Sequence, residues 1–260
     1  MNGADPDRWS GIAANWAELW GGFSDPARLA LIEHAGVGSG TRVLDVGCGS
    51  GEFLALLADH GADVTGVDPA PGMIAIARRS LPNADIREGD FSALPWPDGT
   101  FDVVTAVNSL QFPDDMVAAL REATRVLRPG GRIGIANWAE AGLNDLDTIE
   151  NAVALAAGEE PRRGGDYRRA GGLQSLFARA GLEVTAAGLV ETPWQARDDD
   201  TLVRGVLLGD DSARVAAVRD IVIEASQPFR TAAGGYLLRN AFRFVVGHPA
   251  SPKVAHRFVS

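Results

Sequence analysis

A short apolar run that ends in alternating glycines constrains the fold of this 260-residue chain more than any other feature. Residues 43–51 spell VLDVGCGSG and are followed by the helix-like segment EFLALLADH. The apolar start is typical of a buried parallel strand. Glycines at a strand-to-helix turn let the backbone bend sharply and approach a ligand closely, and the helix that begins near Glu52 directs free N–H groups into the same space. The stretch therefore predicts a cofactor site in an α/β fold.

The spacing of the glycines distinguishes between cofactors. A dinucleotide fingerprint, G-x-G-x-x-G, needs a third glycine where this chain has Glu52, and the third glycine is instead Gly51. An NAD-dependent oxidoreductase is therefore disfavoured. Asp45 precedes Gly47 by two residues, and a carboxylate there suits a ligand with a cationic end better than a pyrophosphate. This GxGxG turn with its preceding acid resembles motif I of the class I S-adenosylmethionine (SAM)-dependent methyltransferases.

Further motifs extend this resemblance over about residues 41–138. Asp68 ends the second expected strand, where a carboxylate can accept hydrogen bonds from both ribose hydroxyls; capping of the helix near Pro71 is the alternative. In the family, an acidic residue after the third strand accepts a hydrogen bond from the adenine amino group, and the next residue packs on the adenine ring. Asp90 and Phe91 match these two positions. The segments LPWPDGTFDVVTAV and LRPGG resemble the branch typified by ubiquinone and menaquinone C-methyltransferases.

The resemblance implies an α/β fold with a Rossmann-like doubly wound seven-stranded sheet. We expect this sheet to be mostly parallel with an antiparallel edge strand, over Phe242–Val246, together with N-terminal helices and a helical lid. The chain then forms a single methyltransferase domain over residues 1–260. Within it we expect cap helices over 1–40, a SAM-binding core over 41–138, and a substrate lid over 193–235, inserted before the last strand.

The cofactor is expected to contact strand ends and one N-terminal helix. Helical spacing over Arg8–Trp20 places Trp9, Trp16 and Trp20 on one face, for which core packing is the alternative. In the family an N-terminal aromatic closes over the methionine end of SAM, and Trp16 matches it best. Cys48 is expected to be a small packing residue. The predicted cofactor-binding residues are Trp16, Asp45, Gly47, Cys48, Gly49, Gly51, Asp68, Pro69, Met73, Asp90, Phe91 and Asn108.

Catalytic residues are harder to predict from the sequence. Methyl transfer from a sulfonium is an in-line displacement, so the protein must mainly align the acceptor and exclude water. A base is needed only when the acceptor's proton is not acidic. The sequence suggests no catalytic dyad, because its histidines lie near expected helix ends or the C-terminus: His34, His60, His248 and His256. The catalytic candidates are Gln111, Asn137, Tyr167 and Glu191. Many relatives have a histidine near the position of Gln111.

An apolar or aromatic acceptor is expected. The residues that we predict to wall its pocket are Trp20, Gln111, Trp138 and Tyr236, although core packing explains the tryptophans almost as well. The segment after the fourth strand lacks the Asp/Asn-Pro-Pro-aromatic motif of enzymes that methylate adenine or glutamine amino groups. The predicted function is transfer of a methyl group from SAM to an oxygen or carbon of a small molecule. The alternative is a SAM-fold protein without methyl transfer, such as a cyclase or a cofactor-binding protein.

Composition limits the partners and the compartment. The net charge is −10 and the isoelectric point is about 4.9, which disfavours nucleic acid as a substrate. The main local basic cluster is Arg162, Arg163, Arg168 and Arg169, and a solvated loop explains it more simply. No apolar run approaches the roughly 20 residues of a membrane span, no metal site is expected, and the polar N-terminus lacks a signal-peptide pattern. With a single cysteine, these features predict a cytoplasmic protein.

Overall fold

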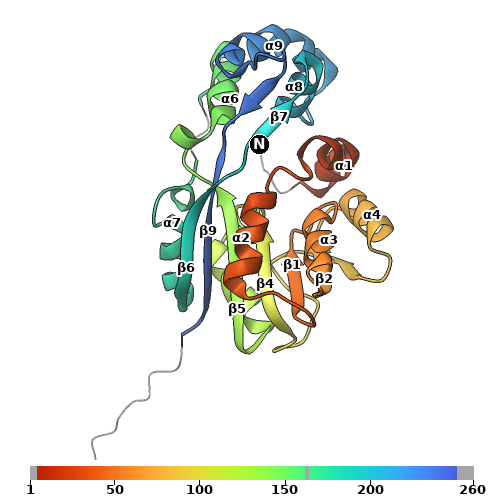
Figure 1. Ribbon diagram of the computed structural model, residues 1–260, viewed down its shortest axis with the longest axis vertical. Helices are drawn as coiled ribbons and strands as arrows, with labels where there is room; N and C mark the ends of the chain where they lie inside the picture. Colours follow the sequence, from red (N-terminus) through yellow and green to blue (C-terminus); the bar gives the residue numbers. More distant parts are fainter. Residues whose placement is uncertain (1–4, 162–163, 251–260) are drawn as a thin grey trace, which may run out of the picture.

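The computed structural model describes residues 5–161 and 164–250, and it is organised around a seven-stranded sheet with the order β3-β2-β1-β4-β5-β9-β6 (Figure 1). Its strands are β1 (Arg42–Val46), β2 (Asp63–Asp68), β3 (Asp85–Glu88), β4 (Phe101–Val107), β5 (Leu127–Trp138), β6 (Leu182–Glu191) and β9 (Ala241–Pro249). The first five pair in parallel, and β9 runs antiparallel to both of its neighbours. The predicted Rossmann-like, mostly parallel sheet is confirmed.

The sequence predicted that the antiparallel strand lies at the edge of the sheet, and this prediction is wrong. The antiparallel strand is β9, which lies between β5 and β6, so that β6 forms the edge. Burial explains this order: nearly every residue of β9 from Ala241 to Gly247 is buried, whereas β6 is exposed or half-buried after its first residue. A run of apolar residues such as FRFVV suits an interior position, and an alternating strand suits an edge.

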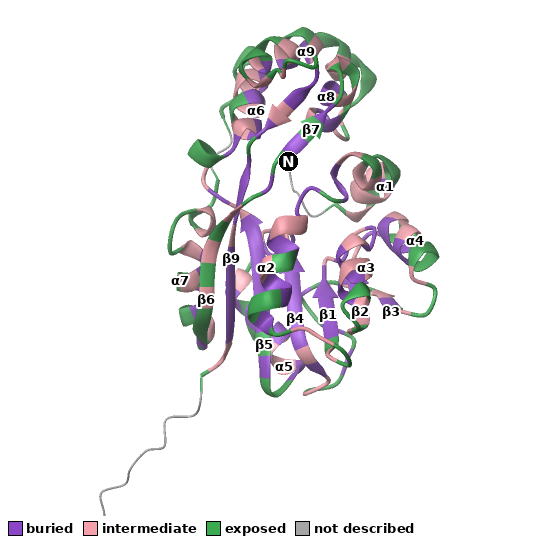
Figure 2. Ribbon diagram, in the orientation of Figure 1, coloured by how far each residue is buried: buried purple, intermediate pink, exposed green. Residues whose placement is uncertain are grey.

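Helices cover both faces of the sheet, as a doubly wound fold requires. On one face lie α2 (Asp25–Ala35), α3 (Glu52–Asp59) and α4 (Pro71–Ser80); on the other lie α5 (Met116–Arg125) and α7 (Gly172–Ala180). Neighbouring residues of one strand serve the two faces, because Val43 packs in the core under α2 and α3 while Leu44 packs under α5 and α7. Figure 2 shows the buried centre of the sheet. Among the described residues, no helix has the length and apolar character needed to cross a bilayer.

The first helix, α1 (Pro6–Trp20), lies beside α4 above the sheet (Figure 1). Asp5 caps it by accepting the N–H groups of Asp7 and Arg8. Gly72 at the start of α4 donates its N–H to Ser10 Oγ over 3.0 Å, and a Cβ at this glycine would come within 2.5 Å of the Ser10 carbonyl oxygen. A glycine is thus needed for the two helices to approach so closely.

A separate helical unit rises above the carboxyl ends of the strands (Figure 1). It contains α6 (Asp145–Ala156), α8 (Asp199–Val206), α9 (Ser212–Ala225) and a two-stranded sheet of β7 (Trp194–Ala196) and β8 (Tyr236–Leu238). Short 3-10 turns lie at η1 (Ala141–Leu143), η2 (Asp166–Arg168) and η3 (Gln227–Phe229). The segment 193–235 that we predicted as a lid supplies most of this unit. Its third helix, α6, comes from before β6 and packs against α9, so the unit is built from two separate parts of the chain.

An aromatic seam joins α1 to the helical unit. The rings of Trp20 and Trp194 stack with centroids 4.4 Å apart and planes 8° apart. Trp194 Nε1 donates to the carbonyl of Leu19 over 2.6 Å, and Trp20 Nε1 donates to the carbonyl of Gly205 over 3.2 Å. Both indoles are almost fully buried, so their N–H groups need these partners. Because Trp20 ends α1 and Trp194 begins β7, the seam fixes one element to the other.

Replacing Trp194 tests the contribution of this seam. We expect Trp194→Ala to lower the free energy of unfolding by about 3–5 kcal/mol, as is usual when a buried aromatic is truncated and leaves a cavity. Urea denaturation followed by circular dichroism measures it. The control is Leu155→Ala on α6, where the side chain is 64% exposed and the expected change is within about 0.5 kcal/mol. Equal effects of the two substitutions would contradict the prediction.

Candidate cofactor and active site

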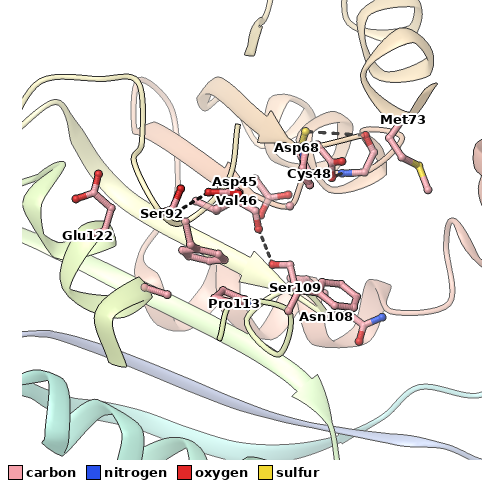
Figure 3. Close-up of a pocket in the computed structure, with 18 of the residues that line it drawn as sticks. Asp45, Val46, Cys48, Asp68, Met73, Ser92, Asn108, Ser109, Pro113 and Glu122 are labelled. Atoms are coloured by element: carbon pink, nitrogen blue, oxygen red, sulfur yellow. Dashed lines mark hydrogen bonds between the residues drawn. The ribbon is translucent and has the colours of Figure 1, made fainter. Parts of the chain in front are cut away.

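A cavity of about 910 Å³ lies at the carboxyl ends of β1, β2 and β4, beneath α1 (Figure 3). Ligands in doubly wound sheets bind at such strand ends. All but one of the predicted cofactor-binding residues line it, namely Trp16, Asp45, Gly47, Cys48, Gly49, Asp68, Pro69, Met73, Asp90, Phe91 and Asn108. The sequence therefore located the wall of one cavity from residues that are spread over more than ninety positions of the chain.

The glycines of the turn serve different purposes. Gly49 has a φ of +54°, and a Cβ built on it would meet no atom within 4 Å; its bare backbone leaves open space for a ligand in the cavity. Gly51, the exception among the predicted residues, does not line the cavity. Its φ is +95°, and a Cβ there would lie 3.0 Å from Ala77 Cβ on α4. Gly51 is therefore needed for the start of α3 and its packing on α4.

Asp68 connects the glycine turn to the end of β2. Its Oδ2 accepts the N–H of Gly49 and its Oδ1 accepts the N–H of Ala70, both over 2.9 Å. Each oxygen keeps acceptor capacity for a further donor, and the side chain faces the cavity. Burial raises the pKa of this carboxyl, while the two backbone N–H groups oppose the increase. No side chain caps α4 by a hydrogen bond. Asp68 accepts only the N–H of Ala70, the residue just before α4, so it does not cap the helix itself.

Asp45 is the most deeply buried acid of the cavity, with 2% of its surface exposed. Its Oδ1 accepts the hydroxyl of Thr105 over 2.8 Å. Burial raises the pKa of Asp45 to about 7, and the hydrogen bond from Thr105 and the positive charge of Arg28 oppose this shift. A cation placed in the cavity would favour the charged form of Asp45.

Arg28 is a cavity residue that the sequence did not reveal. It lies on α2 with 7% exposure, and its Nη1 donates to the Gly21 carbonyl over 2.6 Å and to Asp25 Oδ1 over 2.7 Å. Its Nε is buried and has no hydrogen-bond partner among the described residues. The available signal was spacing: Arg28 precedes the buried Leu31 by three residues on the same helical face. Arg28 and Asp45 bring opposite charges to one cavity.

Three amide side chains form a chain that ends at the cavity. Asn137 Nδ2 donates to Gln111 Oε1 over 2.9 Å, and Gln111 Nε2 donates to both the carbonyl and the Oδ1 of Asn108. Asn108 lines the cavity, but Gln111 and Asn137 do not. Among the residues described, Asn108 is the only non-glycine with a positive φ, at +54°, a conformation often found at functional sites. The two catalytic candidates thus contact this cavity only through Asn108.

The other predicted acceptor and catalytic residues do not line this cavity. Trp20 and Trp138 pack with Phe23 and Phe242 in the hydrophobic core next to the aromatic seam, so the core alternative describes them. Tyr236 is buried in the helical unit, where its hydroxyl donates to Asp199 Oδ1 over 2.7 Å.

Tyr167 packs against the core on the α5 and α7 face, and Glu191 is exposed at the end of β6. Aromatic residues that line the cavity without having been predicted to do so include Trp9 and Phe112. Periodicity had placed Trp9 on the same face of α1 as Trp16, but it could not show that α1 turns this part of its face toward the cavity.

The described histidines and the described arginines of the basic cluster do not line the cavity. His34 stacks on Phe244, and neither His60 nor His248 lines the cavity, while His256 is outside the described residues. Of the basic cluster, Arg168 pairs with Asp147 and Arg169 pairs with Asp166. Arg162 and Arg163 also lie outside the described residues.

Comparisons with known proteins agree with this geometry. The family described as "Methyltransferase domain" matches residues 44–135. Demethylmenaquinone methyltransferase of Beutenbergia cavernae is 41% identical over 111 residues, which cover 43% of this chain and 46% of that protein. A protein of Mycolicibacterium smegmatis, described as a probable S-adenosylmethionine-dependent methyltransferase, is 33% identical over 203 residues, 70% of this chain and 78% of its own.

The fold also resembles solved structures. The crystal structure of the YcgJ protein of Bacillus subtilis aligns with a TM-score of 0.59 and 20% identity, over 87% of this chain and 99% of that one. Identity this low supports the fold alone. Against demethylmenaquinone methyltransferases, the chain spans about half the length of the relatives it matches, 46% and 55% in two cases.

The buried carboxyl of Asp45 predicts a pH dependence of stability. The folded protein holds this proton up to a pKa of about 7, whereas the unfolded chain releases it near about 4. The contribution of Asp45 to the free energy of unfolding is therefore full below pH 4 and is lost as the pH rises to 7. Asp45→Asn, which keeps the acceptor for Thr105, should be more stable than the wild type at pH 8, and this gain should shrink at pH 5.

Urea denaturation of both proteins from pH 4 to 8 measures the effect. The control is Asp59→Asn, which makes the same change in net charge at an exposed position at the end of α3. A stability gain in Asp45→Asn that stays constant with pH, or grows on acidification, would contradict the prediction.

Proposed function

Because this chain belongs to the class I SAM-dependent methyltransferases, in their type 11 branch, we propose that it transfers a methyl group from SAM to an oxygen or carbon of a small-molecule acceptor. The observation that carries the proposal is the composition of the cavity. A bare glycine turn, a carboxylate with free acceptor capacity and a pair of opposite charges line the same space at the strand ends. These features suit the nucleoside and amino-acid parts of SAM.

Each part of the cofactor has a chemically matched partner in this proposal. Asp68 accepts the ribose hydroxyls, since one carboxylate can accept both hydroxyls of a diol. Asp90 accepts the adenine amino group, and Phe91 and Met73 pack on the ring. Asp45 pairs with the amino group of the methionine end. These four contacts were expected from the sequence, and their side chains line the cavity together.

Arg28 adds a partner for the carboxylate of the methionine end. Its guanidinium is positively charged at any physiological pH, and its Nε has an unused hydrogen-bond donor. A buried donor without a partner costs free energy, and an anionic ligand oxygen would satisfy it. The methionine end of SAM carries one positive and one negative group, which matches Asp45 and Arg28.

Bound SAM supplies a methyl group on a positively charged sulfur, which is ready for in-line displacement without further activation. The protein's task is then to align the acceptor and to keep water out. The described histidines lie away from the cavity, and Asp115 is held as the cap of α5, where the N–H groups of Ala118 and Val117 lower its pKa. The chain therefore fits an acceptor that ionises easily by itself.

The helical unit acts in this proposal by holding α1 over the cavity. Lid residues 193–235 do not line the cavity, but α1 does, and α1 is attached to the unit at several points. Arg204 on α8 pairs with Glu18 over 2.8 Å, and Arg8 donates to the Leu208 carbonyl over 3.4 Å. Together with the stacking of Trp20 on Trp194, these contacts run along the whole length of α1.

Calorimetry with S-adenosylhomocysteine tests the cofactor proposal. The wild type should bind it, and Asp68→Ala should weaken binding by more than about tenfold, which corresponds to about 1.4 kcal/mol. The variant loses the ribose hydrogen bonds together with the two backbone hydrogen bonds that position the turn. The circular dichroism spectrum should stay unchanged. The control Glu183→Ala, exposed on β6, should bind normally. No binding by the wild type would contradict the cofactor proposal. Unchanged binding by Asp68→Ala would contradict the ribose-binding role of Asp68.

A second ligand separates the roles of Asp68 and Arg28. 5′-Methylthioadenosine has the adenine and ribose of SAM but lacks its amino-acid end. Arg28→Met should weaken binding of S-adenosylhomocysteine by about tenfold or more, the usual cost of removing one partner of a buried charged pair. Binding of 5′-methylthioadenosine should change little. Equal losses for the two ligands would mean that Arg28 supports the cavity without contacting the carboxylate.

A further inference from the structure

We infer that the part of the cavity beneath α1 binds a planar aromatic acceptor that carries an acidic hydroxyl group. In this inference Trp9 and Phe112 contact the ring of the acceptor, and Asn108 donates a hydrogen bond to its oxygen. The inference rests on the methyl-transfer function proposed above and adds the class of the acceptor.

Aromatic rings from two elements meet at this part of the cavity. The ring of Trp9 on α1 makes an edge contact with Trp16, with centroids 5.3 Å apart and planes at 88°. It makes another with Phe112, which follows β4, at 5.9 Å and 66°. All three side chains line the cavity and are half-buried, whereas the indoles of Trp20 and Trp194 are buried in the core.

Such rings favour a planar aromatic partner. Aromatic side chains bind other rings through offset or edge-on contacts that add to the burial of apolar surface. Pro6 on α1 and Val107 at the end of β4 line the same cavity and bring no charge. A flat ligand can lie against this wall with its ring, and a ligand without a ring loses the aromatic part of the interaction.

The charges nearby disfavour an acceptor that is a carboxylate. Asp114 and Asp115 follow Pro113 directly, line the cavity and are exposed. These two aspartates would repel a carboxylate on the acceptor. Of the three arginines that line the cavity, Arg28 is buried and the proposed function assigns it to the cofactor. Arg125 pairs with Asp98 and Glu122, and the positive charge of Arg121 already acts on Asp115, whose pKa it helps to lower. A neutral hydroxyl avoids both difficulties.

Asn108 presents a hydrogen-bond donor whose orientation is fixed. Its carbonyl and its Oδ1 both accept from Gln111 Nε2, over 2.9 Å and 3.0 Å, and Asn137 holds Gln111 in turn. The amide oxygen of Asn108 is thus engaged, and no described residue accepts from its Nδ2. In Figure 3 this amide lies well apart from Asp45 and Asp68. A fixed donor in a cavity stabilises an oxygen that becomes negative.

Weak bases near the rings determine how acidic the hydroxyl must be. No described histidine lines the cavity, and the acids beside the rings, Asp114 and Asp115, carry carboxylates, which are weak bases. The acceptor therefore loses its proton to solvent first, and its oxyanion then forms the oxygen–methyl bond as the sulfur–methyl bond breaks. An aromatic or enolic hydroxyl ionises far more readily than an aliphatic one. Donation from Asn108 stabilises the resulting oxyanion, which places the nucleophile beside the rings of Trp9 and Phe112.

Calorimetry with two matched probes tests the inference. 2-Naphthol is planar and acidic, whereas 2-decalol has the same carbon skeleton and hydroxyl but is saturated. With S-adenosylhomocysteine at saturation, 2-naphthol should bind at least about tenfold more tightly than 2-decalol. Phe112→Leu should reduce this preference to about threefold or less. Phe229→Leu makes the same change at a half-buried phenylalanine of η3, outside the cavity, and should leave the preference intact.

Further variants keep the test decisive if Phe112→Leu does not fold. Trp9→Leu should have the same effect as Phe112→Leu. Asn108→Asp keeps the shape of the side chain but replaces the donor with an acceptor, and it should weaken binding of 2-naphthol by about tenfold. Affinity for S-adenosylhomocysteine should stay within about threefold of the wild type in Trp9→Leu. Because Asn108 is also a predicted cofactor contact, Asn108→Asp is measured at its own saturating concentration of S-adenosylhomocysteine.

The outcomes distinguish the inference from the function on which it rests. If the wild type binds S-adenosylhomocysteine but shows no preference for 2-naphthol, the inference fails and the proposed function stands. A preference that survives in both Phe112→Leu and Trp9→Leu, or unchanged binding of 2-naphthol by Asn108→Asp, also overturns it. If the wild type binds no S-adenosylhomocysteine at all, the proposed function and the inference fall together.

Discussion

The two hydrogen bonds that Asp68 accepts from the backbone hold the site together. They tie the glycine turn after β1 to the loop after β2, because Gly49 and Ala70 donate to opposite oxygens of one carboxylate. Burial raises the pKa of Asp68 and, more strongly, that of Asp45. The fold thus buries two acids at a cost in free energy. A ligand that carries hydroxyl groups and a positive charge would stabilise both of them.

The roof of the cavity depends on contacts that lie far from it. α1 covers the strand ends with Trp9 and Trp16, yet its position is set by Gly72 on one side and by the stacking of Trp20 on Trp194 on the other. Close packing makes this arrangement rigid. The helical unit can therefore influence the cavity without contributing a residue to its wall.

The sequence predicted the core of the fold well and its periphery less well. The seven strands and the helices between them follow from apolar runs, glycine turns and capping residues such as Asp115, which are local signals. The position of β9 inside the sheet was missed, since it depends on which strand β5 pairs with. The inclusion of α6 in the helical unit was missed for the same reason: pairing over long distances leaves no local pattern.

By itself, the sequence determined which strand-end residues line the cavity, because these residues end successive parallel strands and such ends meet at one edge of a sheet. Only the tertiary structure decided what else faces the cavity. It turned Trp9 and Phe112 inward, and it brought Arg28 from α2 to the side of Asp45. It also buried Trp20 in the core and packed the half-buried Trp138 against it. The physical reason is that a helical stripe shows which face is buried, but not against what. The partner of that face is chosen by the packing of distant elements.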